Sequence, residues 1–475
     1  MNILKTIASK IGMDKSIAYS SGANILRAFT GLASIYFISL CLTGEEQGYY
    51  YTFGSILAIQ VFFELGFTGI ITQYVAHEQA HLKWTDDGLH LVGEEKYKSR
   101  LTHLLHFCIK WYSVIAVLLF VVLTVVGYVF FSKYSKDESV SWVLPWLFIC
   151  MGTCLNLMIS PLNSFVQGLG KVKEMSKIAF YIAFIAPTTS WICLLLEFKL
   201  YVVGVISFLT AVLYIGYFCC TSLKTILYNI WKGQITERIS YMKEIFPYQW
   251  KIALSWVSGY FIFQLFNPVL FATEGAKVSG QMGMTLQVLN AISALSMNWI
   301  TTKVPLFSRL IELKDYLSLD KIFNKTVLQE SSICLGFLFI YVLGVEFLRY
   351  IHLGFGGNLI GDRFLALIPM ILMCVPVYTN QFVFSVATYL RCHKKEPFLI
   401  QSIVMGGSTM LSTLILGKEF GLYGICIGYC ALSVIVSFPW GMMIFITKKR
   451  KWHGKRLRVY TIVVFSFIRT FAPSF

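Results

Sequence analysis

The residues Val114–Phe131, with the sequence VIAVLLFVVLTVVGYVFF, form an apolar stretch that contains no charged side chain. A helix needs about 20 mostly apolar residues to cross the ~30 Å hydrocarbon core of a bilayer. Ala179–Leu196 and Leu422–Ile446 are further stretches of the same kind. Several such stretches in one chain indicate a protein that crosses a membrane many times.

The composition supports an integral membrane protein. Among the 475 residues, 56% are hydrophobic and only 13% are charged, whereas soluble domains carry about 25% charged residues. A water-soluble enzyme of this length would need a polar surface that this composition cannot supply. Disordered and nucleic-acid-binding proteins are excluded for the same reason, although the net charge is +16.

Apolar stretches of sufficient length recur along the whole chain, separated by charged or turn-forming segments. We therefore predict an all-α polytopic membrane protein with about twelve transmembrane helices. The expected spans lie at roughly 16–41, 48–75, 105–131, 142–168, 178–196, 200–222, 248–272, 280–301, 330–350, 364–389, 398–416 and 421–446. The second span is the least apolar, because Gln60, Glu64 and Gln73 interrupt it.

The distribution of basic residues predicts how the chain is oriented. Most of the 40 Lys and Arg residues lie in the N-terminal segment, in the even-numbered connections and in the tail after the last span. An excess of basic residues in short loops marks the cytoplasmic side of a membrane. Both termini are therefore expected in the cytoplasm, which requires an even number of spans.

The two ends of the chain have their own character. Residues 1–15 place Ile3, Leu4 and Ile7 on one helical face with lysines elsewhere, which predicts an interfacial helix and no cleavable signal peptide. Residues 447–475 form a basic cytoplasmic tail, whose short apolar end is also expected at the interface. The twelve cysteines fall mostly inside spans, so a disulfide framework is not expected.

A weak internal repeat predicts two lobes. Thr43–Phe53, which enters the second span, resembles Glu274–Met284, which enters the eighth, and Gly48 corresponds to Gly280. Six spans precede the repeat point, so both halves enter the membrane in the same direction. We predict two parallel six-helix lobes, joined by a basic cytoplasmic connection, with the substrate cavity between them. The predicted boundaries are 16–223 for the N-lobe, 224–247 for the connection and 248–446 for the C-lobe.

Signatures of catalysis and of metal binding are missing from the sequence. The eight histidines lie in loops or at span ends, and His77 and His81 have no third metal ligand near them. Walker loops and HExxH motifs are absent too. We therefore expect neither an enzyme nor a catalytic, metal or cofactor site.

Two charged residues lie deep inside predicted spans. Arg27 and Glu64 are each about eleven residues from the cytoplasmic end of their span, so both are expected roughly 16 Å deep. An unpaired charge at the bilayer centre costs ~2.5–3.5 kcal/mol. An Arg27–Glu64 ion pair and a role in substrate binding are both consistent with these positions. Glu64 is the only carboxylate expected well inside a span, since Glu330 and Glu346 fall near the ends of the ninth.

Amides and basic side chains occupy the first, second, seventh and eighth spans, which we expect to line the cavity. The candidate substrate-binding residues are Asn24, Arg27, Gln60, Glu64, Lys251, Asn267, Gln287 and Asn290. Individual amides can instead form hydrogen bonds between helices. A neutral-to-positive cavity that is rich in amides suits an anionic, hydroxyl-rich substrate, such as a diphosphate that carries sugars.

Short motifs carry a family resemblance. They are Phe63-Glu-Leu-Gly-Phe-Thr-Gly, Gln73-Tyr-Val-Ala, Val166-Gln-Gly-Leu-Gly-Lys-Val and Lys303-Val-Pro-Leu-Phe. These segments are similar to segments of Wzx-type polysaccharide flippases of the multidrug/oligosaccharidyl-lipid/polysaccharide exporter superfamily, and the resemblance in architecture covers residues 10–446. It implies a MATE-like pair of lobes in the bacterial inner membrane that work by alternating access.

The resemblance also implies a substrate. This would be an undecaprenyl-diphosphate-linked oligosaccharide, such as an O-antigen or capsule repeat unit, flipped to the outer leaflet with H⁺ or Na⁺ coupling left open. Family members carry functional basic residues in helix 1 and in helix 7 or 8, a pattern that Arg27 matches and Lys251 matches less well. The alternative is a cation-coupled multidrug exporter of the same superfamily, and a membrane-bound polysaccharide polymerase or acyltransferase is a third class.

Overall fold

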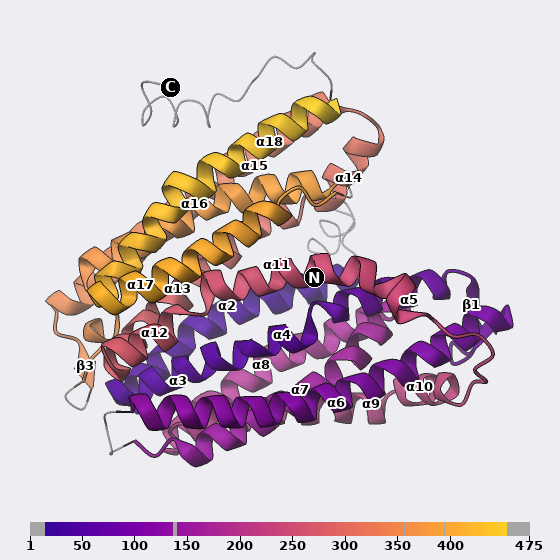
Figure 1. The fold of residues 1–475 in the computed structure, drawn as a ribbon, viewed down its shortest axis with the longest axis horizontal. Coiled ribbons are helices and arrows are strands. Elements are labelled where there is room, and N and C mark those ends of the chain that lie inside the picture. The colour runs from indigo at the N-terminus through magenta and orange to yellow at the C-terminus, as the bar shows by residue number, and fades with distance from the viewer. Residues whose placement is uncertain (1–14, 136–139, 356–357, 394, 454–475) are drawn as a thin grey trace, which may run out of the picture. The chain divides into compact units, whose positions relative to one another are not determined.

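The computed structural model describes residues 15–135, 140–355, 358–393 and 395–453. It is built almost entirely of helices (Figure 1). The chain divides into two compact units, Met1–Gly283 and Met284–Phe475. The lobe boundaries inferred from the repeat stay a prediction. The interfacial segments predicted at the two ends of the chain lie outside the described residues, apart from Lys15.

The first unit holds most of the transmembrane helices. Its helices are α2 (Lys15–Cys41), α3 (Gly44–Leu57), α4 (Val61–Glu64), α5 (Phe67–Gln79), α6 (Glu95–Tyr134), α7 (Val143–Gly168), α8 (Val172–Leu195), α9 (Tyr201–Cys220), α10 (Leu223–Trp231), α11 (Phe246–Phe263) and α12 (Phe266–Thr273). Shorter elements are the 3₁₀ turn η1 (Ala58–Gln60), the π-helical turn η2 (Tyr241–Ile245) and the antiparallel hairpin β1 (Leu82–Trp84) and β2 (Leu91–Gly93).

Aromatic packing fixes the core of this unit. Helix α2 lies along α8, and α7 packs against α5, α6 and α9. Phe53, Phe131 and Trp146 are fully buried, with the ring centroid of Phe53 5.1 Å from that of each of the other two. The indole N–H of Trp146 donates to the Leu123 carbonyl at 3.2 Å, so this large side chain is buried without an unpaired polar atom.

Helix α13 (Ala276–Thr301) begins in the first unit and continues into the second. The other helices of the second unit are α14 (Val304–Glu312), α15 (Tyr316–Tyr350), α16 (Leu367–Arg391), α17 (Leu399–Ala431) and α18 (Phe438–His453), with the π-helical turn η4 (Leu432–Ser437) between the last two. The hairpin β3 (Gly354–Phe355) and β4 (Asn358–Leu359) and the 3₁₀ turn η3 (Gly361–Arg363) precede α16. Helix α16 packs against α15, α17 and α18 around buried Phe323, Tyr389 and Phe445.

The helices account for the predicted spans. Within the described residues, nine helices are long and apolar enough to cross a membrane, and a tenth span consists of Gly44–Glu64 and Phe67–Gln79, bent by 43°. The segment Leu399–His453 counts once, but its 55 residues include a kink at Gly421. At 1.5 Å per residue it is roughly 80 Å long, which is enough for two crossings. Helix α13 corresponds to the eighth predicted span but is more polar and is not among the nine or ten, so the number twelve stays a prediction.

Two helices extend beyond their predicted spans. Helix α6 begins at Glu95, about three turns before the apolar stretch at 105, and α15 begins at Tyr316, about four turns before the apolar stretch at 330. Their first turns carry charged residues on one face and buried apolar residues such as Leu101 and Phe323 on the other. The prediction that Glu330 lies near a helix end is therefore wrong, because Glu330 is in the middle of α15 and only 1% exposed.

Candidate functional site

The second span is broken next to the predicted acidic residue. Helix α4 ends at Glu64, and Leu65 and Gly66 both adopt left-handed backbone conformations, with φ of 50° and 67°, before α5 begins at Phe67. A Cβ on Gly66 would lie 2.5 Å from Cγ2 of Ile252, so only glycine allows α11 to approach this closely. Discontinuous helices often build substrate sites in transporters, because the break frees backbone polar groups.

Gln60 and Glu64 lie just before this break, and both side chains are half-buried. The Glu64 Oε1 accepts a hydrogen bond from the Thr68 hydroxyl at 2.7 Å, which ties the last turn of α4 to the first turn of α5. Gln60 is the last residue of η1, one turn before Glu64. The two residues therefore lie one turn apart on the same short helical segment. The sequence-based expectation from their i, i+4 spacing was a shared helix face.

Arg27 is exposed on α2 and forms a local hydrogen bond. Its guanidinium donates to Asn24 Oδ1 at 3.3 Å, and both side chains are exposed. Among the ion pairs of the described residues, none joins Arg27 to Glu64, or to any other carboxylate. The pairing left open by the sequence is thus not found among the described residues, and Glu64 is bonded to Thr68 at the helix break. A span that exposes an arginine without a carboxylate needs water or an anion beside it.

Lys251 lies on the helix that packs against the break. It is exposed on α11, and its Nζ is 5.7 Å from the ring centroid of the neighbouring Trp250. Phe62 of α4 contacts the same helix, with its ring centroid 5.1 Å from that of Tyr260. The second and seventh spans therefore lie side by side here, through apolar and aromatic contacts, and the shared polar surface stays a prediction.

Asn267 lies in a buried chain of hydrogen bonds. Its Nδ2 donates to the Ser55 hydroxyl at 3.1 Å, and its carbonyl accepts from the Ser279 hydroxyl at 2.9 Å. The Ser279 hydroxyl also lies 2.9 Å from that of Thr52. Within the part of the chain that the structure describes, the Asn267 Oδ1 has no partner. These contacts link α3, α12 and the start of α13, which is the interhelical alternative considered for the amides.

Gln287 and Asn290 belong to the second unit. They are three residues apart on α13 and so share one helix face. Gln287 is half-buried and Asn290 is exposed. Their role in lining a cavity stays a prediction.

A buried polar network in the second unit was missed from the sequence. The Ser385 hydroxyl donates to Glu330 Oε2 at 2.6 Å, and the Gln381 amide donates to the Ser293 hydroxyl at 2.7 Å. Within the described ranges, Glu330 Oε1 and Gln381 Oε1 are buried without partners. The sequence does contain a helical pattern that includes Glu330. Buried residues recur there every three or four positions, at Phe323, Val327, Glu330, Cys334 and Leu338.

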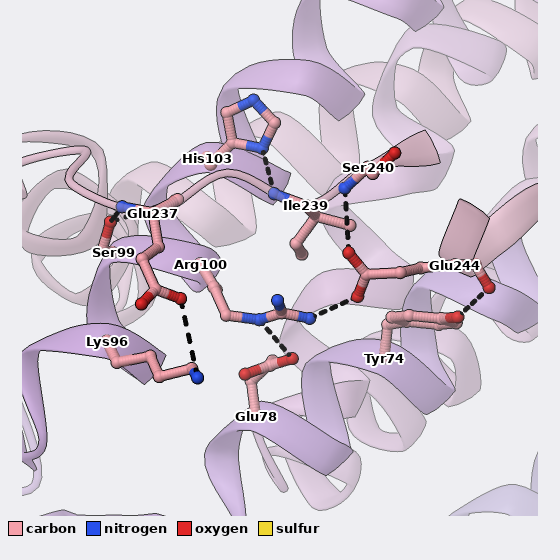
Figure 2. A network of polar contacts seen from close by, with 10 residues as sticks. All are labelled: Tyr74, Glu78, Lys96, Ser99, Arg100, His103, Glu237, Ile239, Ser240 and Glu244. Atoms are coloured by element: carbon pink, nitrogen blue, oxygen red, sulfur yellow. Dashed lines mark hydrogen bonds and ion pairs between the residues drawn. The ribbon is translucent and has the colours of Figure 1, made fainter. Parts of the chain in front are cut away.

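A second polar network, also not predicted from the sequence, joins the connection between α10 and α11 to helices α5 and α6 (Figure 2). The Arg100 guanidinium donates to Glu78 Oε1 at 2.9 Å and to Glu244 Oε2 at 2.6 Å, and the Tyr74 hydroxyl donates to the Glu244 carbonyl. Partial burial acts to raise the pKa of Glu244, but hydrogen bonds from the Ser240 N–H and from Arg100 hold that pKa below its usual range. Arg100 therefore fastens the start of the seventh span to α5 and α6.

No protein-family model and no curated protein sequence matches the chain. Solved structures with a similar fold include an inward-facing multidrug-resistance MATE family transporter of the MOP superfamily, with 14% identity, 89% of this chain and 99% of that chain covered, and a TM-score of 0.58. The MATE multidrug transporter DinF-BH has 12% identity, coverage of 93% and 97%, and a TM-score of 0.59. The lipid II flippase MurJ, in an inward closed conformation, has 13% identity, coverage of 91% and 87%, and a TM-score of 0.57.

These similarities establish the fold. The chain is a multi-pass membrane protein with the MATE-like architecture of MOP-superfamily transporters, which confirms the predicted fold class. The matched structures are those of multidrug transporters and of a lipid-linked-substrate flippase, and identities of 12–14% do not carry either substrate over to this chain.

Proposed function

We propose that the protein is a flippase that moves an undecaprenyl-diphosphate-linked oligosaccharide across the bacterial inner membrane, with both termini in the cytoplasm. The observation that carries the proposal is the exposed Arg27 on α2, which has Asn24 as its neighbour and no carboxylate partner among the described residues. A guanidinium can grip a diphosphate with two parallel hydrogen bonds. The exposed Asn24 amide beside it suits a hydroxyl group of a sugar.

The proposed mechanism assigns each group a task. Arg27, with help from Lys251, holds the diphosphate, and Asn24, Gln60, Gln287 and Asn290 offer hydrogen bonds to sugar hydroxyls. Asn267 is left out of this role, because it is buried and bonded between helices. The lipid tail stays in the bilayer, so that the protein shields only the polar headgroup from hydrocarbon. The break at Leu65–Gly66 gives the second span a point at which it can bend as access alternates between the two sides of the membrane.

Glu330 is the residue that we assign to ion coupling. Its carboxyl group is 1% exposed, bonded to Ser385 through one oxygen only, and has no ion-pair partner among the described residues. Carboxyl groups inside transmembrane helices serve as proton relays in pumps and transporters. Proton uptake and release at Glu330 can therefore drive a change in the packing of α15 against α16. Glu64 is the second titratable candidate.

A cation-coupled multidrug exporter is the alternative function. The observation in its favour is the pair of carboxyl groups inside spans, Glu64 and Glu330, since carboxylates can bind cationic drugs as well as protons. Helices α2 and α11 carry the exposed basic residues Arg27 and Lys251 and contain no Asp or Glu. This charge distribution weighs against a cationic substrate.

Two cell-based assays separate these functions. Expression in cells that lack their own flippase is expected to restore surface polysaccharide, whereas expression in a strain deficient in drug pumps is expected to leave drug susceptibility unchanged. Resistance to cationic drugs without restored polysaccharide would support the exporter and overturn the proposal.

A further inference from the structure

A cavity of about 470 Å³ lies on the surface of the first unit, where the connection after α10 crosses α6. Four basic side chains line it: His103, His106 and Lys110 from α6, and Arg238 from the connection. Its other walls are apolar and include Phe107, Trp111 and Val114. This cavity is separate from the polar residues proposed to bind the glycan, and the inference does not rest on that function.

The structure holds the connection firmly against this face of α6 (Figure 2). The Ser99 hydroxyl accepts hydrogen bonds from the backbone N–H groups of Thr236 and Glu237 at 2.7 and 2.8 Å, and the N–H of Ile239 donates to His103 Nδ1 at 3.2 Å. These bonds fix the backbone on both sides of Arg238. The Arg238 side chain therefore projects from a backbone that hydrogen bonds hold in place at the cavity.

The cavity is positive because the nearby carboxylates are directed elsewhere. Glu78 and Glu244 both bind Arg100, and Glu237 lies 3.8 Å from Lys96. Among the described ion pairs, none involves Lys110 or Arg238, and both side chains are exposed. Two fixed positive charges without counter-charges thus face the same small space.

One of the two histidines, His103, adds a free hydrogen-bond donor to these charges. Nδ1 of His103 accepts from the Ile239 N–H, so its Nε2 carries the proton in the neutral ring. His106 donates from Nδ1 to the Thr102 carbonyl at 2.8 Å, and its ring stacks on Trp231 with centroids 3.7 Å apart. The site thereby combines ammonium, guanidinium and imidazole donors, which suit a phosphate group.

The apolar end of the cavity continues along α6 as an exposed stripe. Trp111 is 42% exposed and Val114 57%, and they are followed at helical spacing by exposed Leu118, Val121 and Val125. From Trp111 to Val125 the stripe is about 21 Å long, more than one ~15 Å leaflet of the hydrocarbon core. A soluble anion would make no contact with this apolar stripe, whereas the acyl chains of a lipid would cover it.

We infer that this cavity binds the phosphate headgroup of an anionic membrane phospholipid, with the acyl chains along the exposed stripe of α6. Lys110 and Arg238 bind the phosphate, and Trp111 marks the level of the membrane interface, where tryptophan is commonly found. Basic pockets on the cytoplasmic side of membrane proteins bind anionic lipid headgroups. The lipid would join α6 to the connection that leads into the seventh span.

Native mass spectrometry of the purified full chain tests this assignment. The probes are phosphatidylglycerol, phosphatidylcholine and soluble glycerol phosphate. Wild-type protein is expected to retain one phosphatidylglycerol more tightly than phosphatidylcholine. The double variant K110Q/R238Q is expected to lose roughly 25-fold in affinity for phosphatidylglycerol, at about fivefold for each basic residue. The matched control is K133Q, which removes an exposed lysine from the other end of α6.

Three results would overturn the inference. One is equal retention of phosphatidylglycerol by the double variant and the wild type, and another is an equal loss in K133Q. The third is saturable binding of glycerol phosphate with the affinity of the phospholipid, which would make the site one for a soluble anion. Thermal stability of each variant in phosphatidylcholine is expected to match that of the wild type, because neither Lys110 nor Arg238 has an ion-pair partner among the described residues.

Discussion

Gly48 and Gly280, which occupy corresponding positions in the internal repeat, meet backbone to backbone. A Cβ on Gly280 would lie 2.9 Å from the Gly48 nitrogen, and a Cβ on Gly48 would lie 2.0 Å from the Ala276 carbonyl oxygen. The Gln47 side chain donates to the Gly280 carbonyl at 2.8 Å beside this contact. The contact joins the two segments that the internal repeat aligns.

The Gly48–Gly280 contact predicts a strong size limit. Alanine at either position would place a methyl group against backbone atoms that cannot move aside, and overpacking of this kind typically costs about 1–3 kcal/mol. We expect Gly48→Ala and Gly280→Ala to lower the thermal unfolding temperature of the purified protein. Gly54→Ala on the same helix is the control, since a Cβ there has no atom within 4 Å. A Gly48→Ala protein as stable as Gly54→Ala would contradict the close approach.

The Arg100 network predicts a loss of stability in its variants. Glu78 is 3% exposed and Arg100 only 17%, and removal of one partner from a buried ion pair costs on the order of 3 kcal/mol. Arg100→Gln is expected to lower the unfolding temperature and to open the connection between α10 and α11 to proteases. Lys96→Gln is the matched control, because its pair with Glu237 is long and about half exposed on both sides. Equal effects of the two variants would contradict a special role for Arg100.

Glu244 predicts how this network responds to pH. Because the pKa of Glu244 is lowered in the folded protein, its stabilisation is complete above the ordinary value of 4.5 and is lost as the pH falls through the folded-state pKa. Protease cleavage of the connection is therefore expected to rise below about pH 4.5 in the wild type. Glu244→Gln should be cleaved readily at neutral pH and should show a flatter pH profile. An unchanged profile in this variant would show that another group titrates.

The buried carboxyl group predicts a coupling defect. Glu330→Gln keeps the shape of the side chain and its hydrogen bond to Ser385 but cannot release a proton, so we expect stable protein whose transport no longer responds to a pH gradient. Transport into vesicles with and without an imposed gradient measures this. The control is Glu346→Gln on the same helix, whose side chain is 36% exposed and paired with Arg349. Gradient-driven transport by the Glu330 variant would assign coupling elsewhere.

The sequence predicted the spans well because an uncharged apolar stretch of about 20 residues is long enough to cross the bilayer and too apolar for a loop. It predicted the helix ends poorly, since the first turns of α6 and α15 carry charges that are also typical of loops. Because the start of α15 was placed too late, Glu330 was expected at a helix end. The ion pairs of Arg100 could not be predicted either, since its two partners are far away in the sequence.

The contacts of the candidate site residues could not be predicted from the sequence. Equal depth along two helices suggested that Arg27 and Glu64 could pair, but depth does not determine the direction in which each side chain points. The left-handed residues Leu65 and Gly66 turn the chain at that level. Asn267 illustrates the opposite outcome, because the hydrogen-bonding alternative that was open for every amide is the one the structure contains.

Translocation of a lipid-linked oligosaccharide by Arg27→Gln protein is the most direct measurement of the proposed function. In cells that lack their own flippase, wild-type protein and the control Lys173→Gln, an exposed lysine at the start of the adjacent α8, are expected to restore surface polysaccharide. Arg27→Gln is expected to reach the membrane at normal levels and to restore at most about a tenth as much, as loss of a charge-assisted contact of about 1.5–3 kcal/mol implies. Full surface polysaccharide with this variant would contradict the assignment of Arg27 to the diphosphate.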